Sequence, residues 1–199
     1  EMNHSGRFWA LVETLRPDWR TQRRWLRDHG AELLVAADQE GGKVSRLRSL
    51  FPSFKFYSPA EMGAMTDAEV FEHAKAIGTM MFQAGVNMNL APPLDACDPG
   101  TLMAKQGRCF GASTDLVTLK GQAYVNGILD TFPEAALVAK HFPGYNERRN
   151  SDVTPVFSKE TREEVMARAR PFFDVQGLAG VMMSSIRYEA FGGEVAVFC

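Results

Sequence analysis

Short apolar runs alternate with amphipathic segments along this sequence. The runs are rich in Val, Leu, Ala and Met and end in polar or turn residues, a pattern typical of buried strands. In the segments between them, apolar residues recur at three- and four-residue intervals, which indicates helices packed on a core. The predicted strands are 33–37, 86–91, 135–141 and 178–183, and the predicted helices are 8–15, 19–29, 67–84, 114–130 and 159–173.

Capping residues support the helix boundaries. Gly30 and Gly85 fit the left-handed position that follows a helix. Short hydroxyl or carboxylate side chains precede the later helices, where they can accept hydrogen bonds from free backbone N–H groups. These candidate caps are Thr66 or Asp67, Ser113 or Thr114, and Ser158.

Strands that alternate with helices predict parallel βαβ units and an α/β fold. Every predicted strand is followed by polar residues, as expected for a (β/α) barrel of the TIM type, whose active site lies at the carboxyl ends of its strands. A doubly wound sheet is the alternative, although neither a GxGxxG nor a Walker sequence occurs. The polar strand ends are Asp38, Asp95, Lys140-His141 and Ser184-Ser185.

The bulk composition narrows the class of protein. The 199 residues suffice for a single domain over 1–199, with 45% hydrophobic and 23% charged residues. A net charge of −2 gives no reason to expect a nucleic-acid partner. The arginines at 20, 23, 24 and 27 fit the solvated face of a helix. No apolar stretch is long enough to span a membrane.

The cysteines bear on the compartment. There are three, Cys97, Cys109 and Cys199, with no CxxC spacing. An odd number argues against a disulfide framework and fits a reducing compartment. No signal peptide is visible after Glu1-Met2, so we expect a cytoplasmic protein.

The strongest candidate for a functional site is the segment Lys140-His141-Phe142-Pro143-Gly144. It ends an apolar run and precedes a polar loop over 145–152. A rigid strand end followed by such a loop is a plausible catalytic arrangement. The alternative is structural: a salt-bridged lysine and a packed histidine. Metal binding is not expected, because only His141 of the four histidines lies in a candidate site motif.

Four ordered motifs resemble glycoside hydrolase family 3, in its bacterial β-N-acetylglucosaminidase branch. They run from about residue 33 to 188, in the family's order and with roughly its spacing. The motifs are Asp38-Gln39-Glu40-Gly41-Gly42-Lys43-Val44-Ser45-Arg46-Leu47, Leu90-Ala91-Pro92-Pro93-Leu94-Asp95, Gly107-Arg108-Cys109-Phe110 and Lys140-His141-Phe142-Pro143-Gly144.

The resemblance implies a (β/α) barrel that cleaves terminal β-linked N-acetylglucosamine from peptidoglycan fragments or chitin oligomers with retention of configuration, without a cofactor. It implies sugar contacts by Asp38, Arg46, Arg108, Lys140 and His141. Those side chains suit a ligand rich in hydroxyl groups, since carboxylates accept and cations donate charge-assisted hydrogen bonds. A strand-end salt bridge is the alternative for Asp38 and Arg46, and Asp95 can equally fix its own turn.

The sequence departs from the family at the catalytic groups. The family's nucleophile is an Asp in a Ser-Asp-Asp type motif, and no such motif occurs here, so the nucleophile is unknown and we expect only part of a barrel. In this chain, the loop that carries the family's Asp-His dyad is shorter by about two residues and contains no histidine. Asp152, in that loop, is a candidate acid/base. Arg148 and Arg149 offer a competing explanation, in which they keep an exposed Asp152 ionised. Tyr145 and Ser185 each stand where the family usually has a histidine.

Several functions therefore remain open. One is a glycosidase, and another is a non-catalytic sugar-binding or regulatory relative. A third is a half-barrel interaction module that self-associates through open strand edges as a homo-oligomer. A phosphate-binding barrel has only Gly192-Gly193 in its favour.

Overall fold

The computed structural model describes residues 33–193. The chain divides into two units, Glu1–Leu34 and Val35–Cys199, and the described helices, strands and pockets belong to the second. The predicted helices 8–15 and 19–29 and the arginine cluster between 20 and 27 lie outside the described residues. A single domain over 1–199 stays a prediction.

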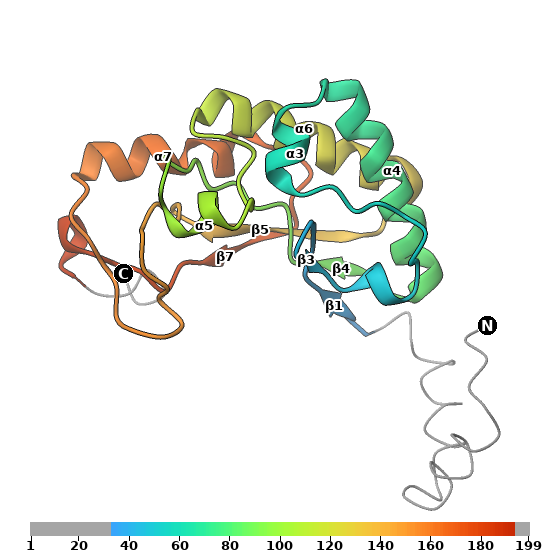
Figure 1. The fold of residues 1–199 in the computed structure, drawn as a ribbon, viewed down its shortest axis with the longest axis horizontal. Helices are drawn as coiled ribbons and strands as arrows, with labels where there is room; N and C mark the ends of the chain where they lie inside the picture. Colours follow the sequence, from blue (N-terminus) through green and yellow to red (C-terminus); the bar gives the residue numbers. More distant parts are fainter. Residues whose placement is uncertain (1–32, 194–199) are drawn as a thin grey trace, which may run out of the picture. The chain divides into compact units, whose positions relative to one another are not determined.

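The centre of the fold is a parallel four-stranded sheet, which confirms the predicted βαβ pattern (Figure 1). Its register aligns Ala36 with Met88, and Met88 in turn with Ala136. In spatial order the strands are β1 (Ala36–Ala37), β4 (Met88–Asn89), β5 (Ala136–Phe142) and β7 (Gly180–Met183).

The long helices lie close to their predicted ranges, and the shorter helices and turns were not predicted from the sequence. The helices are α3 (Pro59–Gly63), α4 (Asp67–Ala84), α5 (Leu102–Lys105), α6 (Thr114–Thr131) and α7 (Arg162–Asp174), with 3-10 turns η2 (Leu47–Ser49) and η3 (Glu189–Phe191). Thr66 caps α4 and Ser113 caps α6, each by accepting a hydrogen bond from the backbone, and Gly85 closes α4 with a φ of 71°. The helices α4, α6 and α7 run along one face of the sheet in Figure 1.

The predicted cap of α7 was wrong. Thr161, not Ser158, accepts the hydrogen bond from the backbone N–H of Glu164, and the Glu164 carboxylate accepts one from the Thr161 N–H in return. This reciprocal capping box satisfies two backbone N–H groups. Ser158 cannot form one, because the residue three positions after it is a threonine and not an acidic residue. Ser158 lies instead in β6 (Phe157–Ser158), which pairs with β8 (Arg187–Tyr188).

Helices α4 and α6 pack closely at small residues. A Cβ added at Gly127 would lie 2.3 Å from the Phe71 carbonyl oxygen and 2.7 Å from the Ala74 Cβ. Only glycine permits this approach of the two backbones. The contact buries the apolar stripes of both helices, including Val70, Ala74, Ile77, Met81, Val117, Val125 and Ile128, against residues of the sheet such as Leu137.

The first strand is less buried than predicted. Val35 is 44% exposed and Ala36 is also exposed, so the expectation of a buried strand over 33–37 was wrong for these residues. The cause is position, because β1 lies at an edge of the sheet and pairs with β4. No described helix is long and apolar enough to cross a membrane.

A small hairpin follows β1 and carries the first sequence motif. Its strands are β2 (Gln39–Gly41) and β3 (Val44–Ser45). Gly41 has a φ of 103°, and a Cβ there would lie 1.9 Å from the Tyr57 carbonyl oxygen. Glycine at this position therefore allows both the turn and its close contact with the segment before α3.

His73 on α4 is a half-buried base with a shifted pKa. Its ring stacks on Phe54 with centroids 5.1 Å apart and meets Tyr57 edge-on, and its Nε2 has no hydrogen-bond partner among residues 33–193. Burial lowers the pKa of His73 from 6.5 to about 4, against a smaller opposing effect of Glu61.

We predict that His73 makes the fold less stable in mild acid. Because its folded pKa lies below its unfolded value, its neutral form stabilises the fold above pH 6.5, and that contribution is lost as pH falls towards 4. The expected loss between pH 7 and pH 5 is about 1 kcal/mol, after a discount for partial exposure. Urea unfolding at both pH values measures it; a His73→Phe variant with an equal pH dependence contradicts it.

Candidate functional site

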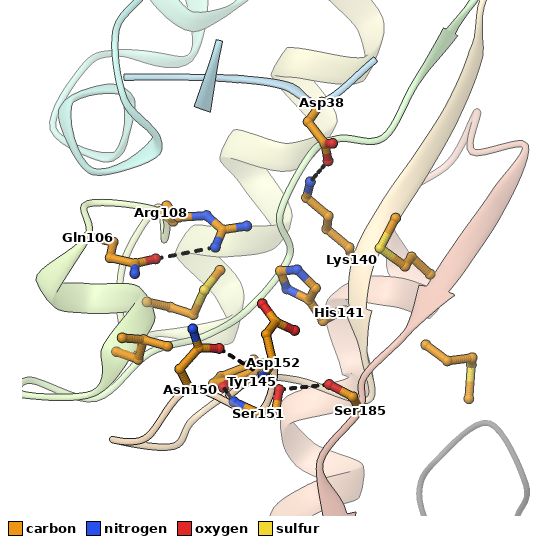
Figure 2. A pocket seen from close by; sticks show the side chains of 14 residues that line it. Asp38, Gln106, Arg108, Lys140, His141, Tyr145, Asn150, Ser151, Asp152 and Ser185 are labelled. Atoms are coloured by element: carbon orange, nitrogen blue, oxygen red, sulfur yellow. Dashed lines mark hydrogen bonds and ion pairs between the residues drawn. The ribbon is translucent and has the colours of Figure 1, made fainter. Parts of the chain in front are cut away.

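The predicted site residues gather at one pocket of about 340 Å³. It opens where β5 ends and the loop after β1 passes, at the carboxyl ends of the parallel strands (Figure 2). Five of the six predicted residues line it, namely Asp38, Arg108, Lys140, His141 and Asp152. Its other lining residues are Leu102, Met103, Gln106, Tyr145, Asn150, Ser151, Met182, Met183 and Ser185.

Lys140 and His141 both line the pocket although they are neighbours on a strand. Consecutive residues of a regular strand point to opposite faces. Here the pairing of β5 with β7 shifts register between Lys140 and Phe142, and Lys140 also bridges to Pro93. Such an irregularity redirects a side chain, so two adjacent polar groups reach the same pocket.

Lys140 is bound by two carboxylates. Its Nζ lies 2.5 Å from Asp38 Oδ1 and 2.6 Å from Glu40 Oε1, and its side chain is only 2% exposed. The salt bridge considered as the structural alternative for Asp38 and Lys140 therefore exists. It lies on the pocket wall, since both residues line the pocket, and so it does not exclude a binding role.

Glu40 belongs to this cluster of side chains, although the sequence alone does not single it out. Its fully buried carboxylate also accepts two hydrogen bonds from Arg108, at 2.8 Å from Nε and 2.7 Å from Nη2. No local sequence signal marks this role, because Asp38 lies between β1 and β2 and the partners of Glu40 are distant in the chain.

A buried polar network fixes the backbone that carries Asp38 and Glu40. The side chain of Asn89 on β4 accepts from the Gln39 N–H at 3.0 Å and donates to the Gln39 carbonyl at 3.2 Å. The Tyr124 hydroxyl of α6 donates to the same carbonyl at 2.6 Å. Burial raises the pKa of Tyr124 and keeps it a neutral donor, although the Asn89 hydrogen bond opposes that shift.

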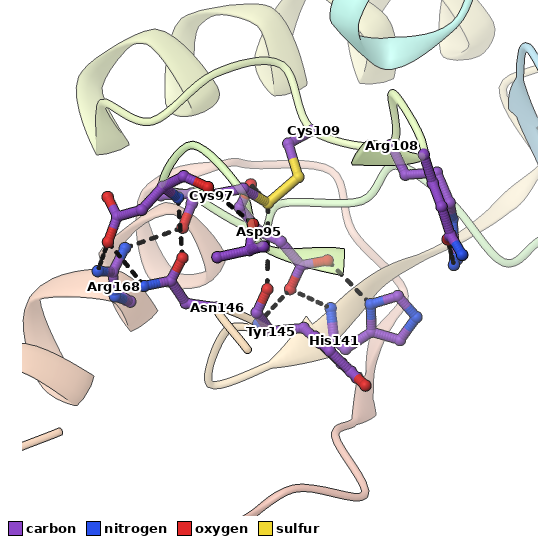
Figure 3. The surroundings of a disulfide bond; sticks show 12 residues. Asp95, Cys97, Arg108, Cys109, His141, Tyr145, Asn146 and Arg168 are labelled. Carbon is purple, nitrogen blue, oxygen red and sulfur yellow. Dashed lines mark hydrogen bonds and ion pairs between the residues drawn. A yellow bond between two sulfur atoms is a disulfide. The ribbon is translucent and has the colours of Figure 1, made fainter. Parts of the chain in front are cut away.

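Asp95 holds His141 from behind the pocket (Figure 3). Its buried carboxylate accepts from the backbone N–H groups of His141 at 3.1 Å and Tyr145 at 2.7 Å, and its Oδ2 lies 2.8 Å from His141 Nδ1. Asp95 thus fixes a neighbouring strand end and not only its own turn. A carboxylate beside Nδ1 favours a proton on that nitrogen, which leaves Nε2 of the pocket-lining ring for a ligand.

The loop after β5 is held in place by the residues that depart from the family pattern. The Tyr145 hydroxyl donates to the Arg149 carbonyl and accepts from the Ser151 N–H, both at 2.8 Å. The Ser151 and Ser185 hydroxyls lie 2.7 Å apart. Asn150 Oδ1 accepts from the Asp152 N–H at 3.0 Å. These contacts place Ser151 and Asp152 on the pocket wall in Figure 2.

The two arginines expected to keep Asp152 ionised line a different part of the surface. Arg148 and Arg149 line a second hollow of about 370 Å³, together with Asp98 and Asn146. Asp152 is not among the residues that line that hollow, and it faces the first pocket instead. Asp152 is exposed, as the competing explanation expects, but no contact within residues 33–193 joins it to Arg148 or Arg149.

Arg46 is the one predicted residue that the pocket does not include. It is exposed, directly after β3, at the start of η2. Its role in binding a sugar stays a prediction. Within the described part of the chain, no group of three or more His, Cys, Asp or Glu side chains has the geometry to hold a metal ion.

Cys97 and Cys109 form a disulfide, so the expectation of unpaired cysteines was wrong (Figure 3). An odd cysteine count does not prevent pairing, because the third residue, Cys199, need not take part; it lies outside the described residues. The bond ties the segment after Asp95 to the residue beside Arg108. A cytoplasmic location stays a prediction, and the pairing removes the cysteine argument for it.

Comparisons with known proteins match this geometry to one family. The family model described as "Glycosyl hydrolase family 3 N terminal domain" matches residues 11–197. A beta-hexosaminidase of Shewanella frigidimarina is 32% identical over 169 residues, covering 79% of this chain and 48% of its own length. The beta-hexosaminidase LpqI of Mycobacterium tuberculosis is 34% identical over 113 residues, which is 57% of this chain and 29% of its own.

Solved structures agree on the fold. A beta-N-acetylhexosaminidase from Beutenbergia cavernae has a TM-score of 0.70 and 30% identity, covering 79% of this chain and 48% of its own. NagZ from Neisseria gonorrhoeae, in complex with N-trifluoroacetyl-D-glucosamine, has a TM-score of 0.72 at 21% identity, covering 83% and 51%. The four-stranded sheet is part of a (β/α) barrel, and the chain spans about half the length, or less, of these relatives.

We predict that Asp95 sets the tautomer of His141. Wild type should carry a proton on Nδ1, whereas Asp95→Asn presents an amide donor to that nitrogen and shifts the proton to Nε2. Nitrogen NMR of the imidazole rings distinguishes the two forms, and His73 is the internal control whose spectrum should not move. A wild-type His141 protonated on Nε2 alone contradicts the assignment.

We also predict that Cys97 and Cys109 are linked in the oxidised protein. A disulfide with a sequence separation of 12 should stabilise the fold by about 3 kcal/mol. Denaturant unfolding of Cys97→Ala, compared with Cys199→Ala as the matched control, measures this difference. A non-reducing peptide map that recovers residues 97 and 109 as free thiols would exclude the bond.

Proposed function

Because the chain belongs to glycosyl hydrolase family 3, we propose that its pocket binds a terminal β-linked N-acetylglucosamine of peptidoglycan fragments or chitin oligomers, and that the protein hydrolyses that linkage with retention. The observation that carries the proposal is that side chains from distant parts of the sequence meet at one pocket. Three separate segments bring a carboxylate, two cations and an imidazole to one pocket, through Asp38, Arg108, Lys140 and His141.

The chemistry of the wall suits a sugar ring. Arg108 has five N–H donors, of which Glu40 and Gln106 accept from one on each nitrogen, so one N–H on each terminal nitrogen is left. Asp38 uses Oδ1 for Lys140, and its Oδ2 has no partner among the described residues. The free N–H groups of Arg108 are donors and Asp38 Oδ2 is an acceptor. Donors and acceptors held at fixed angles can recognise adjacent hydroxyl groups of a sugar.

Asp152 is the acid/base that this pocket offers. It stands in the loop where the resemblance places a catalytic dyad, and its carboxyl group faces the pocket below the His141 ring in Figure 2. A retaining glycosidase also requires a nucleophile about 5 Å from that acid. Residues 33–193 offer no second carboxylate on the pocket wall besides Asp38, which is bound to Lys140, so the nucleophile stays unassigned.

A non-catalytic sugar-binding protein is the second candidate. Two observations favour it: Tyr145 and Ser185 occupy positions where the resemblance leads one to expect histidine, and both hold the loop by hydrogen bonds. These residues support a shaped pocket without supplying a proton donor near neutral pH. Self-association through open strand edges stays a prediction, with the 43% exposed Val181 on the edge strand β7 in its favour.

We predict that the pocket residues control sugar affinity. Arg108→Ala and Asp38→Ala should each weaken binding of N-acetylglucosamine by roughly 10- to 100-fold, because each removes hydrogen bonds to a charged group. Isothermal calorimetry measures the affinities, and Arg170→Ala, an exposed arginine on α7, is the matched control. Absence of binding by wild type overturns the proposal.

Hydrolysis separates the two candidates. If the protein is a glycosidase, wild type releases nitrophenol from p-nitrophenyl N-acetyl-β-glucosaminide, and Asp152→Asn lowers kcat by roughly 10²- to 10⁴-fold with little change in KM. Asp115→Asn, on the exposed start of α6, should behave as wild type. Sugar binding without turnover identifies the non-catalytic relative, and full activity of Asp152→Asn excludes Asp152 as the acid.

A further inference from the structure

Glu40 contacts both cations of the pocket but does not line it. Its side chain is 0% exposed, and it is absent from the pocket wall. One oxygen, Oε1, lies 2.6 Å from Lys140 Nζ and 2.7 Å from Arg108 Nη2, while Oε2 accepts from Arg108 Nε at 2.8 Å. A ligand in the pocket therefore reaches Arg108 and Lys140 but not the carboxylate that holds them.

The contact with Arg108 has a fixed geometry. Two parallel hydrogen bonds from Nε and Nη2 to one carboxylate hold the guanidinium plane in a single orientation. Burial by itself lowers the pKa of Arg108, but the hydrogen bonds and charge of Glu40, with Asp95 and Asp38, outweigh it and raise that pKa. Arg108 is thus a permanent cation whose remaining N–H groups have a set direction.

The contact with Lys140 affects Asp38. Lys140 is shared between the half-exposed Asp38 and the buried Glu40. If Glu40 were neutral, Asp38 would be the charged carboxylate closest to Lys140 and Arg108. Both oxygens of Asp38 would then bind these cations, and neither would be left for a ligand. The negative charge of Glu40 therefore leaves Asp38 Oδ2 available as an acceptor.

We propose that Glu40 is the positioning residue of the sugar pocket: it sets the direction of Arg108 and, by sharing Lys140, keeps one oxygen of Asp38 for the ligand. The proposal rests on the proposed sugar-binding function for its ligand, but the geometry of the ion cluster exists without one. Glu40 acts through Arg108, Lys140 and Asp38 and touches no substrate.

The first test needs no ligand. Glu40→Gln keeps the shape of the side chain and removes its charge, so the Arg108 guanidinium should lose its rigid partner. Nitrogen NMR of the arginine side chains should show a slowly exchanging, restricted Arg108 Nε–H in wild type and a mobile one in Glu40→Gln. Glu160→Gln is the matched control, because it breaks a partly buried carboxylate–arginine pair with Arg168, away from the pocket. An Arg108 signal that is equally mobile in wild type overturns the proposal.

The second test uses N-acetylglucosamine and calorimetry on the full chain. Glu40→Gln should weaken binding by roughly 10-fold or more in the wild-type background. In an Arg108→Ala background, where its main partner is gone, the same change should cost much less. Glu160→Gln should leave the affinity unchanged. An equal loss in both backgrounds would show that Glu40 does not act through Arg108, and it would overturn the proposal.

A third variant guards against failure of Glu40→Gln to fold. Arg108→Lys keeps the positive charge and loses the two-pronged contact, at a partly exposed position. We expect it to bind the sugar at least 10-fold more weakly than wild type. Wild-type affinity of Arg108→Lys would show that orientation by Glu40 is unnecessary. If wild type binds no sugar but Glu40→Gln releases Arg108, the proposed function fails and the positioning role stands.

Discussion

The pocket depends on the burial of Glu40 together with Lys140. A buried charge without a partner destabilises a fold strongly, and two that meet with good hydrogen bonds largely offset the loss of water. Because Glu40 is fully buried and Lys140 is 2% exposed, each requires the other. Arg108 completes the cluster from a third segment. The hairpin after β1, the end of β5 and the loop after α5 must therefore meet at one point for any of them to be stable there.

A second buried carboxylate, Asp95, repeats this arrangement at the neighbouring residue His141. Asp95 accepts from two backbone N–H groups and faces His141 Nδ1, as Glu40 faces Lys140 and Arg108. Arg108, Lys140 and His141 are thus each held by a carboxylate that does not line the pocket. The disulfide between Cys97 and Cys109 adds a covalent link between the Asp95 segment and the Arg108 segment. Rigid support of this kind is what precise recognition of several hydroxyl groups requires.

The alternation of strands and helices could be predicted from the sequence, whereas contacts that depend on tertiary structure could not. Parallel strands gather their carboxyl ends, so Asp38, Lys140 and His141 were expected in one place, and they lie there. The role of Glu40 depends on partners 68 and 100 positions away, which no local pattern reveals. The cap at Thr161 is different, because the sequence does carry a signal for it. Glu164 lies three residues after Thr161, which is the spacing of a capping box. Cysteine counting could not identify the pair at 97 and 109, because it carries no positional information.

The Tyr145 hydroxyl has a consequence for how fast a ligand enters. It joins the Arg149 carbonyl to the Ser151 N–H, so the rim of the pocket is already ordered before anything binds. A loop that must close over its ligand adds a slow conformational step and loses entropy on binding. A rim secured in advance avoids both, and association should then be set by diffusion into the open pocket. Tyr145 therefore favours a rapid encounter between the pocket and its ligand.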